Sequence, residues 1–237
     1  MNFPSPILKG RLLKRYKRFL ADIELTGKVV TAHCANPGSM MGVKTEGATV
    51  WVTRADNPKR KLPYDWQVIE VGTARVCINT ASANRIVEET VLAGGLPELS
   101  GYETLKREVK YGRNSRIDFL LSGARRPDCY VEVKNVTLSR ETGLAEFPDS
   151  PTVRGAKHLV ELADVVREGY RAVMLYIINR TDCERFTLAA DIDPDYAAKF
   201  AGASQAGVES LAYGTGISES GIGLVSKLSI QQGHQPP

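Results

Sequence analysis

The sequence predicts a small all-β barrel in the first third of the chain, followed by an α/β (α+β) domain built on a mixed sheet. Short stretches of alternating apolar and polar residues, separated by glycines, dominate residues 1–80. From residue 81 onward, amphipathic helix-length segments alternate with strands, and residues 172–178 are continuously apolar, as in a buried central strand. The chain of 237 residues is long enough for both domains to bury a core.

The first domain, residues 1–80, contains short β-type stretches without a convincing helix. The predicted strands cover residues 7–13, 19–25, 29–34, 49–53, 66–71 and 75–79. Five or so strands in about eighty residues favour a small barrel, and an OB-like fold is the best match. An SH3-like barrel would produce a similar pattern.

The second domain, residues 81–230, is predicted to run helix, three strands, helix, strand, helix, strand. The helices are expected at 83–93, with Ser82 as N-cap, at 152–168 and at 194–205; the strands are expected at 104–111, 116–121, 129–137, 172–178 and 208–213. Residues 231–237 are polar and end in Pro-Pro, so we expect a disordered tail.

The charge is unevenly distributed along the chain. Residues 1–80 carry 13 Lys/Arg against 6 Asp/Glu, whereas residues 81–237 carry 18 against 21, for a total of +4. A basic first third favours contact with a polyanion, although a merely solvated surface would have the same composition. No apolar run approaches the roughly 18 residues of a membrane helix, and the N-terminus lacks a signal-peptide pattern. We therefore expect a cytoplasmic protein without a membrane partner.

The four cysteines are widely scattered and form no C-x-x-C pair, so zinc-ribbon spacing is absent. We expect them to be small buried hydrophobic residues.

Cations and aromatic residues alternate in two segments of the first domain. Such segments suit nucleic acid, because cations neutralise phosphates and aromatic rings stack on bases. The alternative is that the rings belong to the core and the cations only solvate its edges. The cations predicted to bind nucleic acid, next to Tyr16, Phe19, Tyr64 and Trp66, are Arg15, Lys17, Arg18, Lys59, Arg60 and Lys61.

Charged residues interrupt two apolar strands of the second domain. Glu132 and Lys134 are two positions apart and so lie on one face of their strand. If the two strands form a hairpin, Asp118 reaches the same region from the neighbouring strand. Two carboxylates and an ammonium group suit a divalent-cation site for phosphodiester hydrolysis, with Asp118 and Glu132 holding Mg²⁺ or Mn²⁺ and Lys134 acting on the attacking water. The alternative is a cross-strand surface salt bridge.

The order of elements around these residues matches the core of PD-(D/E)xK nucleases, in which the Asp and the Glu-x-Lys lie on the second and third strands. In the following helix Arg154, Lys157, His158 and Glu161 form a polar stripe at i, i+3, i+4 and i+7, suited to phosphate contact or to orienting the metal site. An ordinary solvated helix face is the alternative. Further candidate ligands are Glu88, Glu89 and Glu108.

Residues 33–40 contain several turn formers and are predicted to be a compact loop. The loop is interpreted either as a structural turn, as a contact between the two domains, or as a phosphate-binding nest.

Together these segments resemble the sugar fermentation stimulation protein A family of bacteria and archaea. The resemblance covers about residues 3–228 and rests on these motifs: Arg15-Tyr16-Lys17-Arg18-Phe19, His33-Cys34-Ala35-Asn36-Pro37-Gly38, Ser115-Arg116-Ile117-Asp118-Phe119, Glu132-Val133-Lys134-Asn135-Val136-Thr137-Leu138, Phe147-Pro148-Asp149-Ser150 and Arg154-Gly155-Ala156-Lys157-His158-Leu159.

The resemblance implies an OB-like domain, a nuclease-like domain, DNA binding without strong sequence preference, and a regulatory role in sugar metabolism. Asp118, Glu132 and Lys134 match the nuclease-type positions. Our leading hypothesis is a DNA-binding protein with a Mg²⁺- or Mn²⁺-dependent phosphodiesterase site. The second is a non-catalytic DNA-binding regulator that uses the nuclease-like fold as a scaffold. A third is recognition of a nucleotide or small phosphorylated ligand between the domains.

Overall fold

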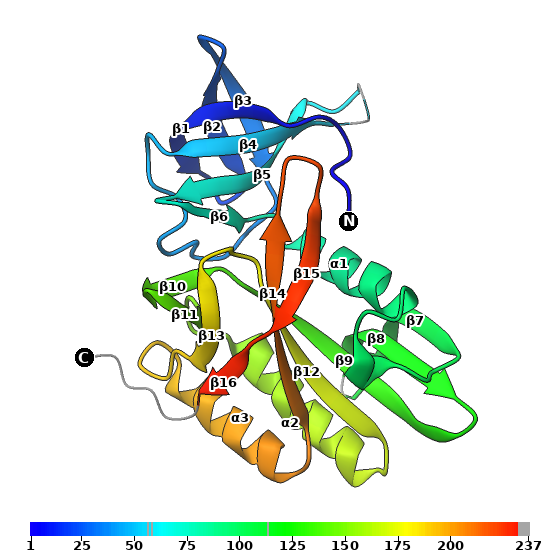
Figure 1. Cartoon of the computed structure of the whole chain (residues 1–237). Coiled ribbons are helices and arrows are strands. Elements are labelled where there is room, and N and C mark those ends of the chain that lie inside the picture. The colour runs from blue at the N-terminus through cyan, green and yellow to red at the C-terminus, as the bar shows by residue number, and fades with distance from the viewer. Residues whose placement is uncertain (56, 58, 113, 232–237) are drawn as a thin grey trace.

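A β-barrel lies at one end of a larger α/β domain in the computed structural model (Figure 1). The structure describes residues 1–55, 57, 59–112 and 114–231. Of the predicted disordered tail, residues 232–237 lie outside the described residues. The prediction was wrong for Gln231, which belongs to the last strand of the sheet structure.

The N-terminal domain is a closed barrel of five strands, as the alternating pattern predicted. Its strands follow the order β3-β2-β1-β4-β5, and a parallel pairing of β3 with β5 closes the barrel; β6 extends the sheet beyond β5. This is the OB architecture. The strands are β1 (Leu8–Tyr16), β2 (Leu20–Leu25), β3 (Lys28–Cys34), β4 (Thr49–Arg54), β5 (Tyr64–Val71) and β6 (Ala74–Cys77).

Strand alternation explains the core of the barrel. In β2, Ala21, Ile23 and Leu25 are buried, whereas the intervening Asp22 and Glu24 are half-buried. Because side chains of a strand alternate between its two faces, every second residue lines the interior. Trp66 also belongs to this core and is fully buried.

The C-terminal domain is built on a six-stranded mixed sheet of order β15-β14-β12-β9-β8-β7. β12 pairs in parallel with β9 and β14, and the outer pairs are antiparallel. Its strands are β7 (Thr104–Tyr111), β8 (Ser115–Gly123), β9 (Arg126–Val136), β12 (Arg171–Ile178), β14 (Glu209–Ile217) and β15 (Ile222–Lys227). The antiparallel β8–β9 pairing confirms the predicted hairpin.

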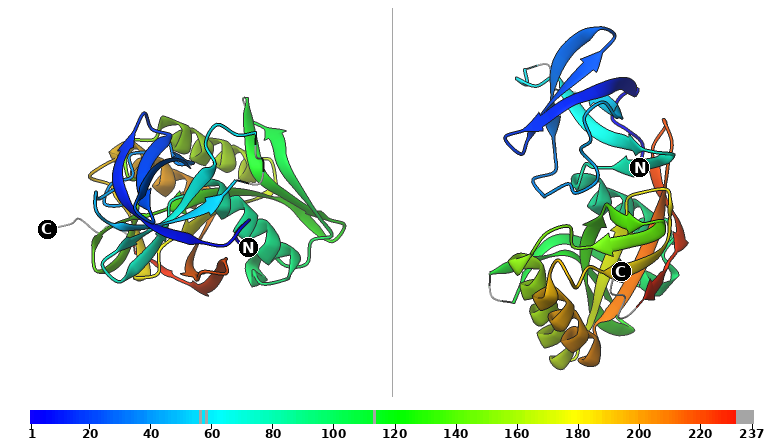
Figure 2. Two further views of the ribbon diagram at one scale, coloured as in Figure 1. Left: turned by 90° about the horizontal axis from the view of Figure 1, so that it is seen from above. Right: turned by 90° about the vertical axis from the view of Figure 1, so that its left-hand side faces the viewer.

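Helices cover both faces of this sheet. The helices α2 (Val153–Arg167) and α3 (Pro194–Gln205) pack side by side on one face (Figure 2), and α1 (Ala81–Leu92) with the 3₁₀ helix η1 (Pro97–Leu99) covers the other. The central strand β12 therefore sends Met174 and Tyr176 into one core and Val173 and Leu175 into the other. This double burial explains why its sequence is apolar throughout.

The helix boundaries follow from capping. The Thr152 side chain accepts a hydrogen bond from Gly155 N at the start of α2, and Asp193 caps α3 in the same way, ahead of Pro194. The predicted cap of the first helix was wrong. Ser82 is a buried residue inside α1, whose N-cap position is Thr80.

A small second sheet, of order β10-β11-β13-β16, was not predicted, and neither was β15. The strands of the second sheet are short, and all but the last carry charges within them, so their periodicity is weak: β10 (Leu138–Glu141), β11 (Gly143–Phe147), β13 (Cys183–Leu188) and β16 (Ser229–Gln231). Their charges are accommodated by pairing, since Arg140 makes ion pairs with both Glu146 and Asp191.

An apolar cluster joins the two domains. Trp51 and Val68 of the barrel pack with Ile86 of α1 and with Ile217 and Ile222 of the β14–β15 hairpin. In addition, Cys77 N donates a hydrogen bond to Asn179 O at 2.9 Å. Among the described residues, none of the helices is both long enough and apolar enough to cross a bilayer.

Candidate acidic site on the central sheet

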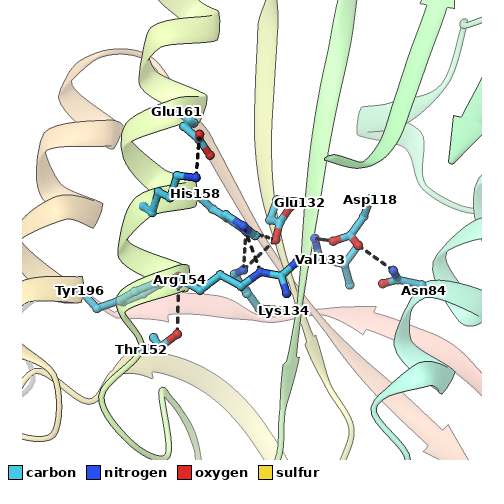
Figure 3. Close-up of polar contacts among 12 residues, drawn as sticks. Asn84, Asp118, Glu132, Val133, Lys134, Thr152, Arg154, His158, Glu161 and Tyr196 are labelled. Carbon is cyan, nitrogen blue, oxygen red and sulfur yellow. Dashed lines mark hydrogen bonds and ion pairs between the residues drawn. The ribbon is translucent and has the colours of Figure 1, made fainter. Parts of the chain in front are cut away.

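Asp118 occupies a point in β8 where the regular pairing with both neighbouring strands is interrupted. The β7–β8 ladder passes from Arg107–Phe119 to Val109–Ile117, and the β8–β9 ladder ends at Phe119–Val131. Instead, the Asp118 carboxylate accepts hydrogen bonds from Val133 N at 2.8 Å and from Asn84 Nδ2 at 2.7 Å. The side chain of Asp118 is thereby held against β9 (Figure 3).

Glu132 and Lys134 lie on the face of β9 that α2 covers. Strand alternation sends Val131 and Val133 into the opposite core, as the sequence spacing predicted. Lys134 Nζ lies 2.8 Å from Glu132 Oε1, and Glu132 is only 4% exposed. The structure thus brings the three predicted site residues together on two adjacent strands (Figure 3).

His158 of α2 completes this group. It is 3% exposed, and its Nδ1 contacts Glu132 Oε1. Arg154 Nε donates to His158 Nε2 at 3.4 Å, so the ring proton lies on Nδ1 and is donated to Glu132. Of the two roles predicted for the polar stripe on α2, the position of His158 fits orientation of the metal site, because the helix turns this residue toward Glu132 and the sheet.

The electrostatics of the two carboxylates differ. Burial raises the pKa of Asp118 to about 6, and the nearby negative charge of Glu132 adds to the shift. Burial acts in the same direction on Glu132, but the contacts with His158 and Lys134 outweigh it and leave the pKa of Glu132 below its ordinary value. Glu132 is therefore ionised at neutral pH. The ionised form of Asp118 is destabilised by burial and by the negative charge of Glu132.

The oxygen atoms fit a hard divalent cation. Among the described residues, no hydrogen-bond donor reaches the buried Glu132 Oε2, an arrangement that costs free energy unless a ligand fills it. In the same part of the chain, no three His, Cys, Asp or Glu side chains are grouped to enclose an ion. A pair of carboxylates suits Mg²⁺ or Mn²⁺ better than a full cage would, because Mg²⁺ keeps several waters.

The other candidate ligands have different surroundings. Glu88 makes an ion pair with Arg107, and Glu89 pairs with the N-terminal ammonium group. Glu108 is exposed on β7. None of these contacts involves Asp118 or Glu132.

Two further polar residues lie beside the site. Asn84 is the residue of α1 that contacts Asp118, and it was not predicted from the sequence. Glu161 lies on α2 one turn beyond His158, where its buried carboxylate is 3.5 Å from Lys157 Nζ.

The basic residues of the barrel divide into two groups. Arg15 donates to the carbonyl groups of Arg18, Asn36 and Gly38, and Arg60 forms a bidentate ion pair with Asp65. These contacts hold the barrel loops together, as does the Arg18 hydrogen bond to Pro37 O. The side chains exposed to solvent and available to a partner include Lys17, Lys59 and Lys61.

The aromatic residues of these segments also differ in exposure. Trp66 is buried in the barrel core, which is the alternative that the sequence left open. Tyr16 is half-buried and donates to Asp22 at 3.0 Å, whereas Phe19 is 47% exposed. Of these three rings, Phe19 is the one most accessible for stacking.

The loop at 33–40 contacts the second domain, one of the interpretations proposed for it. Met40 N donates to Asp149 Oδ2 at 2.9 Å, and Thr80, the N-cap residue of α1 at the domain boundary, donates a hydrogen bond from its hydroxyl to Ala35 O at 2.8 Å. Asn36 Oδ1 accepts from Gly38 N and so tightens the turn. The loop and strands β9 and β11 border a cavity of about 230 Å³.

The cysteines behave as structural residues. Cys34, Cys77 and Cys129 are buried, and Cys183 is half-buried. Burial raises the pKa of the Cys77 thiol to about 11, so it is not a reactive thiolate.

Two family models match the chain in succession. Residues 13–78 match the SfsA N-terminal OB domain, and residues 81–221 match the sugar fermentation stimulation protein RE domain, which is restriction-endonuclease-like. The two matched segments correspond to the barrel and to the mixed-sheet domain.

Curated relatives and a solved structure agree with these matches. A sugar fermentation stimulation protein homolog from Maricaulis maris is 55% identical over 94% of this chain and 95% of its own length. One from Roseobacter denitrificans is 52% identical over 98% and 100%. The structure of Pyrococcus furiosus SfsA in complex with Ca²⁺ superposes with a TM-score of 0.89 at 28% identity, covering 98% of each chain. This chain therefore belongs to the sugar fermentation stimulation protein (SfsA) family, with an N-terminal OB domain and a restriction-endonuclease-like domain.

Proposed function

We propose that this protein binds DNA with little sequence preference and hydrolyses its phosphodiester bonds at the site formed by Asp118, Glu132 and Lys134, with Mg²⁺ or Mn²⁺. The observation that carries the proposal is the buried Glu132 carboxylate, which has one oxygen bonded by Lys134 and His158 and the other without a donor among the described residues. A folded protein retains so costly a group where a ligand or substrate uses it.

Each residue of the site has a distinct role in this proposal. Asp118 and Glu132 would hold the cation, which when bound polarises a phosphate oxygen and lowers the pKa of water. Lys134 would orient the attacking water and offset negative charge on the phosphate in the transition state.

Three further residues position these groups. Asn84 and Val133 N orient the Asp118 carboxylate, and the Nδ1 proton of His158 fixes Glu132 Oε1. Such hydrogen bonds hold a metal-binding carboxylate in one orientation.

The solvent-facing lysines of the barrel support the binding part of the proposal. Lys17, Lys59 and Lys61 are exposed, and cations of this kind release counterions when they neutralise phosphates. A titration of DNA affinity against salt should therefore show log Kd rising with log salt. A slope near zero would mean that phosphate contacts are not the source of affinity.

Cleavage is tested with labelled single- and double-stranded DNA in Mg²⁺ or Mn²⁺. We expect Glu132→Gln and Lys134→Ala each to lower the cleavage rate by about 100-fold or more. Glu184→Gln, at an exposed glutamate outside the site, is the matched control and should cut like the wild type. Equal cleavage by the wild type and both site variants would contradict the proposal and indicate a contaminating nuclease.

The second candidate function is a non-catalytic DNA-binding regulator, including the role in sugar metabolism that the family name suggests. The contacts of Lys134 and His158 with Glu132 Oε1 favour this function. They already satisfy one of the two carboxylate oxygens with which Glu132 would bind a metal ion. Thermal unfolding in Mg²⁺, Mn²⁺ or Ca²⁺ distinguishes the two. Stabilisation that disappears in Asp118→Ala supports the metal site, whereas no stabilisation in the wild type supports the regulator.

A further inference from the structure

A groove of about 850 Å³ runs along α2 next to the acidic site. Tyr130 of β9, Tyr111 at the end of β7 and the second half of α2 line it. Tyr130 and Glu132 are two positions apart on the same strand, so their side chains leave the same face of the sheet, about 7 Å apart. The groove, named here the Tyr111–Tyr130 groove, therefore begins one side chain beyond Glu132.

The floor of the groove is aromatic. The Tyr111 and Tyr130 rings lie with their centroids 5.9 Å apart, and the Tyr170 ring centroid is 5.7 Å from that of Tyr130. Tyr130 is half-buried and Tyr170 is 42% exposed, so part of this ring cluster remains accessible. Aromatic side chains of this kind stack on nucleobases irrespective of sequence.

The groove also contains a polar group that lacks a partner. Tyr111 is 8% exposed, and its hydroxyl has no hydrogen-bond partner among the described residues. Burial raises the pKa of Tyr111, and the carboxylates of Glu132, Glu161 and Asp118 raise it further. The hydroxyl therefore keeps its proton and has a hydrogen bond that none of the described residues accepts.

Among the described residues that line the groove, the charges balance. An equal number of cations and anions cannot attract a phosphate chain, which needs an excess of positive charge. Two of the cations are also engaged in ion pairs, Lys157 with Glu161 and Arg167 with Asp164. The cations are Lys110, Lys157 and Arg167, and the anions are Glu161, Asp164 and Glu168.

We infer that the Tyr111–Tyr130 groove receives an unpaired nucleobase of the nucleotide next to the scissile phosphate. A flat, uncharged base matches an aromatic floor and a neutral lining, and the base carries the hydrogen-bonding groups that the Tyr111 hydroxyl lacks. The inference rests on the proposed function. It specifies the substrate class as single-stranded or locally unpaired nucleic acid, because a base inside a duplex cannot enter the groove.

The first test uses the variants Tyr130→Ala and Tyr130→Phe, and measures their affinity for a labelled single strand and its duplex in EDTA. Loss of stacking on the Tyr130 ring should weaken single-strand binding by about 5- to 150-fold in Tyr130→Ala. Tyr130→Phe keeps the ring and should bind like the wild type. Duplex affinity should be unchanged in both. Equal single-strand affinity of the wild type and Tyr130→Ala would overturn the inference while leaving the proposed function intact.

The second test changes the substrate and keeps the wild-type protein, so it does not depend on how a variant folds. Single strands with one abasic nucleotide at successive positions are cut in Mn²⁺, and the rate is followed at one bond. The rate should fall only when the missing base adjoins that bond. Uniform cleavage irrespective of the abasic position would overturn the inference alone. A wild-type protein that neither binds nor cuts DNA would overturn the proposed function and the inference together.

Discussion

Replacing Asp118 with asparagine should stabilise the metal-free protein at neutral pH. The pKa of Asp118 is raised from 3.8 to about 6, because the ionised carboxylate is buried and faces Glu132. Each pKa unit corresponds to about 1.4 kcal/mol, so ionisation of Asp118 lowers the free energy of unfolding by at most about 3 kcal/mol. The amide introduced by Asp118→Asn would remove this charge and still accept the hydrogen bond from Val133 N.

The pH dependence has a definite sign. A carboxyl group whose pKa is higher in the folded protein contributes its full stability below the unfolded pKa, and the contribution is lost as pH rises through the folded pKa. The wild type should therefore lose stability between about pH 4 and 6.5 relative to Asp118→Asn. Asp118 retains some solvent contact, and asparagine fits its two hydrogen-bond partners imperfectly. We therefore expect the free energy of unfolding of Asp118→Asn to exceed that of the wild type by about 1–3 kcal/mol at pH 7.5.

Urea unfolding in EDTA, followed by tryptophan fluorescence at pH 4.5 and pH 7.5, measures this difference. Trp51 and Trp66 are both fully buried and report unfolding. If Asp118→Asn is less stable than the wild type at pH 7.5, or if the difference is the same at both pH values, the electrostatic reasoning is refuted. Added Mg²⁺ should narrow the difference, because a cation between the carboxylates stabilises only the wild type.

Three further predictions concern packing and reactivity. Tyr176→Phe should lower the free energy of unfolding by about 1–3 kcal/mol, because it leaves the buried Tyr196 hydroxyl without its partner at 2.7 Å; unchanged stability in urea would contradict this. Gly155→Ala should cost about 1–3 kcal/mol, because a Cβ would lie 2.8 Å from Thr152 Cγ2 and 2.9 Å from its capping oxygen. Gly202→Ala on α3 is the control, because nothing lies within 4 Å of a Cβ at this position. It should raise the free energy of unfolding by up to about 1 kcal/mol. A similar loss of stability in both variants would argue against the clash at Gly155. Burial raises the pKa of the Cys77 and Cys129 thiols to about 11. These thiols should therefore react slowly with iodoacetamide in the native protein at pH 8, and fully only after denaturation. Rapid labelling of either thiol in the native protein, located by mass spectrometry, would contradict this.

The positions of the long regular elements could be predicted from the sequence. The helix predicted at 194–205 and the strand at 104–111 have those bounds in the structure. In each case a local period of 3.6 or 2 residues coincides with burial of one face. The short strands β10, β11 and β13 were missed because each holds four to six residues and includes charged ones. Their stability comes from pairing with segments distant in sequence.

The geometry of the acidic site was predictable in part. The spacing of Glu132 and Lys134 places both on one face of a strand, and the turn before β9 makes a hairpin that brings Asp118 near them. The contribution of Asn84 could not be foreseen, since it depends on how α1 packs against β8. His158 was predicted as part of a polar stripe, but its burial against Glu132 could not be foreseen, because the sequence does not specify how far α2 is rotated about its axis.

The basic residues of the barrel show the same limit. The cluster of cations was visible in the sequence, but the fold assigns Arg15 and Arg18 to loop carbonyls and Arg60 to Asp65. Only the backbone path of the loops decides which cation meets an acceptor.

The sequence was sufficient to establish the division into a barrel and a mixed-sheet domain, the family, and the placement of Asp118, Glu132 and Lys134 on neighbouring strands. The folded chain was needed to show which polar side chains are buried, which of them pair, and that Tyr111 and Tyr130 form one groove beside Glu132. The reason is that periodicity is a property of neighbouring residues. Contacts between polar groups depend instead on strand register and helix rotation, which the packing of the whole chain sets.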